Sequence, residues 1–355
     1  MNASNNPFDI GPITLFGSGE TLPASGKAYE FTARALKEQP HIAIVETPAG
    51  FQPNSETVAR KIDEYLSSRL QNYDPAIRLI PARKKGGKFS TNDPHILEPI
   101  LSSNWIFIGP GSPTYAVKNI IDSKLLKYLY ALLYAGRALT LSSAAVLAIS
   151  TFTLPVYEIY KVGEKLHWVP GLDLFDPFGL NAVFIPHWNN NSGGDELDTR
   201  RCYMGLDRFT DLLQLLPASL PIIGIDEQTA LIITLSDQIK WKITGIGNVT
   251  VKRGAEVIQI SAGEYKPAEF GLEFSFPTGL TDDLLDLMEI IENNQRDDPS
   301  PPPQNVIDLA DKRLKVRQSN QWDIADELRD QILSLGWDID DTKDGYQLEK
   351  ISTEN

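Results

Sequence analysis

Short apolar runs alternate with amphipathic segments along the first two thirds of the chain. The apolar runs end at glycine, proline or serine and predict strands, whereas the amphipathic segments repeat apolar residues at helical spacing and predict helices. Strand–loop–helix units of this length imply a mostly parallel sheet that helices cover on both faces. The expected strands are residues 10–16, 41–47, 77–80, 105–108, 181–185 and the run from Ala138, and the expected helices are 27–38, 55–70, 196–216 and a segment from Thr114.

The pattern changes beyond residue 216. Five short runs, separated by glycine and aspartate turns, predict strands at 222–225, 230–235, 239–243, 249–251 and 257–260. Consecutive short strands with tight turns are typical of antiparallel pairing, so we expect them to extend one edge of the sheet. A helix over 281–293 is expected to follow.

A proline-rich segment divides the chain near its end. Residues 297–303 read Asp-Asp-Pro-Ser-Pro-Pro-Pro, a composition typical of a linker. We therefore expect a domain of residues 1–296, a linker at 297–303 and a module of residues 304–355 built as a helical hairpin with a short tail. Within this module Ile324, Leu328 and Ile332 recur at helical spacing and form an apolar stripe that needs a partner surface.

Two adjacent serines, Ser142 and Ser143, stand where the run from Ala138 passes into small, helix-compatible residues. A serine at such a corner can be held exposed on a sharp turn, with free N–H groups of the new helix directed at the atom that it attacks. The Gly-x-Ser-x-Gly spacing of a nucleophile turn is absent around either serine. The spacing leaves both open as a nucleophile, and a capping or turn serine is the ordinary alternative.

His187 and Glu227 could complete a triad with one of these serines. His187 follows the expected strand 181–185 and lies on a polar loop, where a general base can turn one ring nitrogen to the serine and the other to an acid. Asp226 and Glu227 end a later strand, and adjacent side chains there point to opposite sides. A surface histidine and a solvated carboxylate are the alternatives.

Several loops are expected to meet at one edge of the sheet. Ligands of open parallel sheets bind at the carboxyl ends of the strands, where the loops at Gly17, Gly109, Ser143 and His187 would gather. The glycine loops complete neither a dinucleotide fingerprint nor a phosphate loop. The four histidines form no metal-binding pair, and a single cysteine excludes a thiolate zinc cage. We therefore expect no cofactor and no metal.

Charge and cysteine content restrict the partners and the compartment. A net charge of −14 argues against binding to DNA or to an anionic membrane surface. The single cysteine, Cys202, cannot form an internal disulfide, and the first residues lack the basic and apolar segments of a signal peptide. These features predict a cytoplasmic protein with neither a DNA nor a membrane partner.

Together these residues resemble the cyanophycinase and dipeptidase E family of serine peptidases, over roughly the first 235 residues. The resemblance rests on the Gly17-Ser18-Gly19-Glu20 loop, the Gly109-Pro110-Gly111-Ser112 loop, the nucleophile segment Leu141–Val146, the His187-Trp188 segment followed by Arg200, Arg201 and Arg208, and a Gly-Ile-Asp-Glu-x-Thr-Ala motif matched from Gly224 to Ala230.

The resemblance implies an α/β, flavodoxin-like fold of the class I glutamine amidotransferase type. It selects Ser143 as the nucleophile, His187 as its base and Glu227 as the orienting acid. Backbone N–H groups of Ala144 and of Gly109 or Gly111 would stabilise the oxyanion. Homo-oligomers, common for this fold, are expected by analogy only.

The activity that the resemblance implies is cleavage of an amide in a small peptide or amino-acid conjugate through an acyl-enzyme. Residues expected to contact this substrate are Gly19, Tyr157, Glu158, Lys161 and Asn189. The second hypothesis is a catalytically silent binding or regulatory protein that keeps the pocket and acts with a protein or RNA partner through its tail. Replacement of both glycines around the nucleophile by Leu141 and Ala145 favours this second hypothesis.

Residues 306–348 resemble the C-terminal helical module of cysteinyl-tRNA synthetases. The resemblance rests on the Ala-Asp-x-x-Arg-Asp segment from Ala325, Gly336 and the Asp-Asp-Thr-x-x-Gly segment from Asp340. The catalytic signatures of a synthetase are absent from the sequence, so the chain is not a synthetase. Because the tail is acidic, RNA binding is not favoured, and a protein contact is the better hypothesis.

Overall fold

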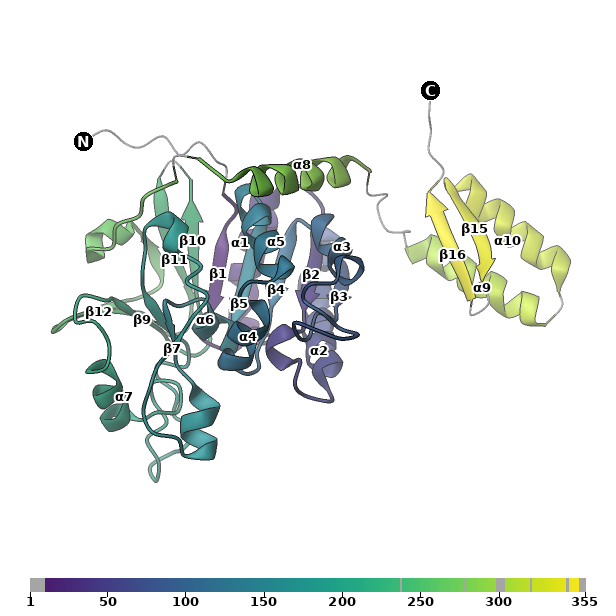
Figure 1. Ribbon diagram of the computed structural model, residues 1–355. Helices are drawn as coiled ribbons and strands as arrows, with labels where there is room; N and C mark the ends of the chain where they lie inside the picture. The colour runs from purple at the N-terminus through teal and green to yellow at the C-terminus, as the bar shows by residue number, and fades with distance from the viewer. Residues whose placement is uncertain are drawn as a thin grey trace. The chain divides into compact units, whose positions relative to one another are not determined.

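The computed structural model describes residues 10–236, 238–277, 279–297, 304–319, 321–342 and 345–350. The chain forms two compact units, residues 1–295 and 296–355. The expected linker at 297–303 lies outside the described residues except for Asp297, which ends a helix. Figure 1 shows the elements of each unit. No helix in the described part of the chain is long and apolar enough to cross a membrane.

An eight-stranded sheet forms the centre of the first unit, with the order β14-β11-β10-β1-β5-β4-β2-β3. Five neighbouring strands are parallel, and β10, β11 and β14 add an antiparallel edge beside β1. The strands are β1 (Ile13–Phe16), β2 (His41–Val45), β3 (Ala76–Ile80), β4 (Trp105–Ile108), β5 (Ala138–Ser142), β10 (Thr229–Leu235), β11 (Ile239–Gly245) and β14 (Gly263–Tyr265).

Helices cover both faces of this sheet because its strands are apolar on both sides. The helices of the unit are α1 (Gly26–Leu36), α2 (Ser55–Arg69), α3 (Pro94–Leu101), α4 (Pro113–Ile120), α5 (Lys124–Tyr134), α6 (Ala144–Ala148), α7 (Leu206–Leu213) and α8 (Asp282–Asp297), with a π-helix at Glu158–Val162 and 3-10 turns at Pro23–Ser25, Thr47–Ala49, Gln71–Tyr73, Asp176–Phe178 and Pro267–Phe270. The predicted α/β class with a mostly parallel sheet is confirmed.

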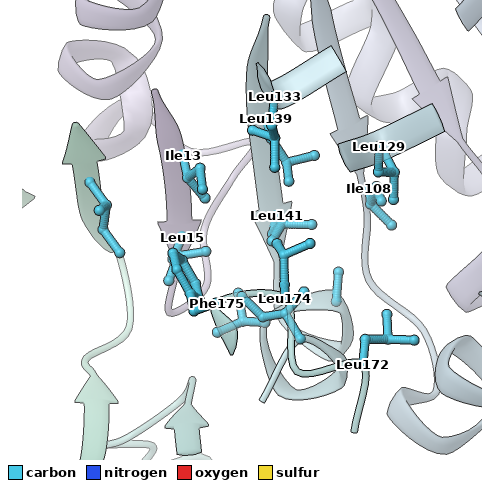
Figure 2. Close-up of a cluster of buried hydrophobic side chains, with 14 of the residues drawn as sticks. Ile13, Leu15, Ile108, Leu129, Leu133, Leu139, Leu141, Leu172, Leu174 and Phe175 are labelled. Carbon is cyan, nitrogen blue, oxygen red and sulfur yellow. The ribbon is translucent and has the colours of Figure 1, made fainter. Parts of the chain in front are cut away.

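Alternate residues of the central strands enter different cores. On one face Leu15 and Leu141 belong to a core that also contains Leu129 and Leu133 of α5, and Figure 2 shows Leu15 beside Phe175 and Leu139 beside Leu133. On the other face, strand residues such as Phe107 pack with α1 and α2. Each fully buried leucine or phenylalanine side chain contributes about 1.5–3 kcal/mol by leaving water. This burial fixes strand register, and therefore fixes where each strand ends at the site.

A second sheet departs from the expected edge extension. It has the order β13-β12-β9-β8, with β8 (Val183–Ile185), β9 (Ile222–Ile225), β12 (Val249–Arg253) and β13 (Glu256–Ile260). Only β10, β11 and β14 extend the main sheet, so the expectation for β9, β12 and β13 was wrong. Short apolar runs with tight turns predict hairpins, but they do not encode which sheet each strand joins. A minor pair, β6 (Phe152–Thr153) with β7 (Val169–Pro170), completes the strands of the unit.

The expected helix over 196–216 was also wrong, because only residues 206–213 are α-helical. Arg201, Cys202 and Tyr203 all have left-handed backbone angles, with φ between 56° and 68°. Asp198 accepts hydrogen bonds from the N–H groups of Arg200 and Leu206, which favours turns over a continuous helix.

The second unit contains the two expected helices and a strand pair that was not expected. Helices α9 (Gln304–Gln318) and α10 (Trp322–Ser334) pack with an antiparallel pair, β15 (Trp337–Thr342) and β16 (Gly345–Lys350). A small core of Val306, Ala310, Ile332, Trp337 and Ile339 joins them. The apolar stripe of α10 is only partly used, because Ile332 is buried whereas Ile324 is 45% exposed.

We expect Asp341→Ala to destabilise the second unit by roughly 2 kcal/mol. Arg313 is 3% exposed and donates two hydrogen bonds to Asp341, at 2.8 and 3.2 Å, so the substitution strands a buried charge. The cost should fall below the roughly 3–5 kcal/mol of a fully buried pair, because Asp341 is 38% exposed. The measurement is thermal or urea unfolding of the full chain.

Acid sensitivity and a neighbouring variant provide the controls for that prediction. The hydrogen bonds from Arg313 lower the pKa of Asp341. The pair therefore stabilises the second unit at pH values above the ordinary aspartate pKa, and this stabilisation is lost as the pH falls through the lowered pKa. The Asp341→Ala protein should not show this loss of stability on acidification. Asp340→Ala, at an exposed neighbour, should change little. Equal effects of the two substitutions would contradict the pairing argument.

Candidate active site

Ser143 occupies a strained turn between β5 and α6. Its φ and ψ are 49° and −110°, a conformation that non-glycine residues rarely adopt, and α6 begins at the next residue. His187 and Gln228 also have positive φ, at 50° and 54°. Backbone strain of this kind persists only where the surroundings enforce it, and it gathers at functional sites. Three strained residues therefore mark the loops that carry Ser143, His187 and Glu227.

The three side chains form a hydrogen-bonded chain. Ser143 Oγ lies 2.9 Å from His187 Nε2, and His187 Nδ1 lies 3.0 Å from Glu227 Oε1. Ser142 is fully buried on β5, and its Oγ has no hydrogen-bond partner of ordinary geometry within the described residues. Of the two serines that the spacing left open, Ser143 is the one that contacts His187.

The hydrogen-bonded side chains of Ser143, His187 and Glu227 meet where the two sheets join. Ser143 follows β5 of the main sheet, and His187 follows β8 of the second sheet. Glu227 lies on the short link from β9 to β10, which connects the sheets. The N–H of His187 donates to the Gly17 carbonyl, 2.9 Å away, at the end of β1. The expected convergence of loops thus involves both sheets rather than one edge.

Close backbone approach at this junction requires glycine. A Cβ on Gly17 would lie 2.1 Å from the Asp226 carbonyl oxygen, and one on Gly111 would lie 2.0 Å from that of Pro48. Neither position has space for a side chain. Ala144 is the first residue of α6, so its N–H has no carbonyl partner within the helix. Ala144, Gly109 and Gly111 stay predictions as oxyanion donors.

Asp226 and Glu227 diverge, as expected for adjacent residues. Asp226 is buried and its Oδ2 accepts the Asn248 N–H, 2.9 Å away. Glu227 turns to His187, and the hydrogen bond from His187 holds the pKa of Glu227 below its ordinary value despite partial desolvation. Glu227 is therefore ionised at neutral pH and can accept the proton on Nδ1, which leaves the Nε2 lone pair for the Ser143 hydroxyl.

A second carboxyl group, that of Glu20, lies near His187. Burial raises the pKa of Glu20, which belongs to the loop after β1, and a backbone hydrogen bond and the nearby His187 only partly offset this shift. The Ser142 hydroxyl is also close enough to favour the ionised form of Glu20. Sequence reasoning placed Glu20 in a glycine loop and gave it no role.

The residues expected to bind substrate fall in different places. Tyr157 and Glu158 line a pocket of about 410 Å³ together with Phe51, Ser112, Thr114, Tyr115, Lys118 and Val162. Glu158 Oε1 accepts a hydrogen bond from Thr114 Oγ1 at 2.5 Å, while its Oε2 is buried and has no partner within the described residues. Lys161 extends over the Tyr157 ring, with Nζ 5.8 Å from the ring centre.

Gly19 and Asn189 are not among the residues that line this pocket. Gly19 packs beside Gln228, the residue after Glu227. Asn189 Oδ1 accepts a hydrogen bond from the backbone N–H of Glu227 at 2.8 Å, so the Asn189 side chain helps to hold Glu227 in place. Tyr203 packs against the base, with its ring centre 5.7 Å from that of His187, and burial raises the pKa of its hydroxyl.

No group of three histidine, cysteine or acidic residues within the described part of the chain could hold a metal ion. Cys202 is a buried free thiol, and burial raises its pKa to about 12. A thiol with such a pKa is not a nucleophile at neutral pH.

Comparisons with solved structures show the fold. The structure is similar to that of a peptidase from an acI-B1 Actinobacterium, with a TM-score of 0.58 and 22% identity over 72% of this chain and 97% of that one. A putative peptidase E protein from Listeria monocytogenes EGD-e aligns with a TM-score of 0.42 and 14% identity over 72% and 100% of the two chains. No family model matches the sequence.

Curated sequences give a short match of another kind. The cysteine–tRNA ligases of Chlamydia felis and Chlamydia caviae are each 41% identical to the chain over 49 residues. The match covers 14% of this chain and 10% of either ligase. The chain thus spans about a tenth of the length of these relatives.

Asn190 and Tyr203 were missed by sequence reasoning. Asn190 is 2% exposed, and its Nδ2 donates to Glu227 Oε1 at 2.6 Å. The Asn-Asn-Asn run after Trp188 was the available signal, but a polar run ordinarily indicates a solvated loop. Tyr203 fell within the expected helix, so nothing in the pattern placed its ring against His187.

Gly224→Ala should destabilise the first unit by about 1–3 kcal/mol, the usual cost of overpacking. A Cβ at residue 224 would lie 2.2 Å from the Trp188 ring. Arg201 covers this ring at 3.7 Å and Phe209 meets its edge at 5.5 Å, so the ring cannot retreat freely. Thermal unfolding measures the effect.

The control for that substitution is Gly86→Ala, because no atom lies within 4 Å of a Cβ at Gly86. Equal stability of the two variants would contradict the packing argument. Because Trp188 follows His187 directly, we also expect Gly224→Ala to disturb the Ser143–His187 contact.

Proposed function

We propose that the protein is a serine hydrolase that cleaves an amide bond in a small peptide or amino-acid conjugate. The observation that carries the proposal is the hydrogen-bonded chain Ser143–His187–Glu227, with contacts of 2.9 and 3.0 Å. The strained turn at Ser143 is a second support, because such a turn presents a serine at the start of a helix.

The proposed reaction is acyl transfer in two steps. Ser143 Oγ attacks the amide carbon while His187 Nε2 takes its proton, and Glu227 stabilises the imidazolium. His187 then protonates the leaving amine, which departs as the carbon–nitrogen bond breaks. Water, deprotonated by His187, attacks the acyl-enzyme, releases the acid and restores Ser143.

Stabilisation of the oxyanion is assigned to the N–H of Ala144 and to one from Gly109 or Gly111. In comparable sites each such donor accounts for about 10²–10³ in rate. The pocket lined by Tyr157 and Glu158 is the proposed seat of the substrate portion next to the scissile bond, with Lys161 at its side. The proposed compartment is the cytoplasm, and the proposed role of the second unit is contact with a protein.

The test is covalent labelling of the full chain by a fluorophosphonate probe, followed by mass spectrometry of the labelled peptide. We expect a single modified residue, Ser143. Heat-denatured protein is the control, because labelling of an activated serine needs the folded site. A label on another residue, or equal labelling of denatured protein, would refute the proposal.

A binding or regulatory protein is the second candidate. It is favoured by Leu141 and Ala145, which stand where the resembling family has glycines and are each 1% exposed. This candidate predicts a folded protein that the probe does not label. It also predicts that a protein or RNA partner co-purifies with the full chain but not with a chain ending at residue 303.

A further inference from the structure

Three hydrogen-bonding groups surround the Glu227 carboxylate and its backbone. Its Oε1 accepts from His187 Nδ1 at 3.0 Å and from Asn190 Nδ2 at 2.6 Å. Its backbone N–H donates to Asn189 Oδ1 at 2.8 Å. The acid is thus held by two consecutive side chains from the loop that also carries His187.

The orientation of the Asn190 amide is fixed by its other contacts. Ser192 donates to Asn190 Oδ1 through its backbone N–H at 3.2 Å and through Oγ at 2.8 Å. A backbone N–H can only donate, so the atom that it meets must be the amide oxygen. The amide nitrogen therefore faces Glu227 and donates to it.

Asn190 is anchored independently of its side chain. Its N–H donates to the His187 carbonyl at 3.2 Å, and its own carbonyl accepts from Thr199 Oγ1 at 3.4 Å. At 2% exposure the side chain is closed off from solvent, so water cannot readily replace its hydrogen bond to Glu227. One short segment therefore connects the base and the acid.

We propose that Asn190 is a positioning residue for the Ser143–His187–Glu227 chain, holding the Glu227 carboxylate in the orientation that accepts the His187 Nδ1 proton. The inference rests on the proposed function for its catalytic meaning. The contact acts in two ways. It prevents the carboxylate from rotating away from His187, and it donates to the charged form, which favours ionisation of Glu227.

The first measurement is the titration of Glu227 in the full chain, followed by NMR of ¹³C-labelled glutamate carboxyl groups. The Glu227 signal is identified by its absence in Glu227→Gln. We expect its midpoint to rise in Asn190→Ala, because a donor to the carboxylate is lost. It should rise further in Asn190→Asp, where a second carboxylate replaces the donor. Asn191→Ala, at an exposed neighbour, is the matched control and should titrate like the wild type.

The second measurement is the rate of fluorophosphonate labelling at neutral pH. We expect Asn190→Ala to slow labelling about 10-fold or more, since hydrogen bonds to charged groups are among the stronger ones. Asn191→Ala should label at the wild-type rate. Asn190→Asp is nearly isosteric and keeps the test available if the alanine variant unfolds.

The outcomes separate this inference from the proposed function. An unchanged Glu227 midpoint in the folded Asn190 variants would overturn it. Where the wild type is labelled, a shifted midpoint with an unchanged labelling rate would overturn it as well. A shifted midpoint in a protein whose wild type is never labelled would refute the proposed hydrolase and still support the positioning of Glu227 by Asn190.

Discussion

Replacement of Ser143 by alanine is expected to abolish fluorophosphonate labelling. The reagent phosphonylates an oxygen that a neighbouring base has activated, and alanine supplies no oxygen. Ser143 Oγ is the hydroxyl that His187 Nε2 contacts, at 2.9 Å. The measurement is the intensity of labelled full-length protein, compared at equal amounts of folded wild type and variant.

Ser142→Ala is the matched control for that experiment. Its hydroxyl is buried on β5, whereas the hydroxyl that His187 Nε2 contacts is that of Ser143, so the substitution leaves the Ser143–His187 contact in place. We expect the Ser142→Ala protein to fold and to label at close to the wild-type rate. Labelling that disappears in Ser142→Ala but persists in Ser143→Ala would contradict the assignment of Ser143 as the activated serine.

The main sheet was predictable because its strands other than β14 have a strong local signal. Residues such as Ile106 and Phe107 enter cores on opposite faces, and an uninterrupted apolar run encodes that burial. The second sheet was not predictable in the same way. Its strands β9, β12 and β13 are as short and apolar as those of the edge, and their pairing is decided by tertiary contacts.

The three triad residues were predictable from the sequence, but the residues that hold Glu227 in place were not. Ser143, His187 and Glu227 follow apolar strands, and the family resemblance chose Ser143 over Ser142. Asn189 was expected to meet substrate, but its Oδ1 accepts the Glu227 N–H. The role of Asn190 depends on a loop with left-handed residues, whose path no periodic pattern encodes.

Glu227→Gln is expected to slow labelling by a factor on the order of 10⁴, the size of effect seen when the acid of such a triad becomes an amide. Asn190 Nδ2 already donates to Glu227 Oε1, so an amide oxygen would remain there as a neutral acceptor that stabilises the imidazolium poorly. If the amide turns instead, its NH₂ group donates to Nδ1. His187 then carries its proton on Nε2 and cannot accept the one from Ser143.

Both arrangements of the introduced amide lead to the same result, so the prediction does not depend on which one forms. The measurement is the labelling rate at neutral pH, with unfolding curves to verify that the variant is folded. Glu196→Gln, the same chemical change at an exposed loop residue, is the control and should label like the wild type. A Glu227→Gln protein that labels within about threefold of the wild type would mean that His187 needs no ionised partner, and the acid would lose its place in the proposed mechanism.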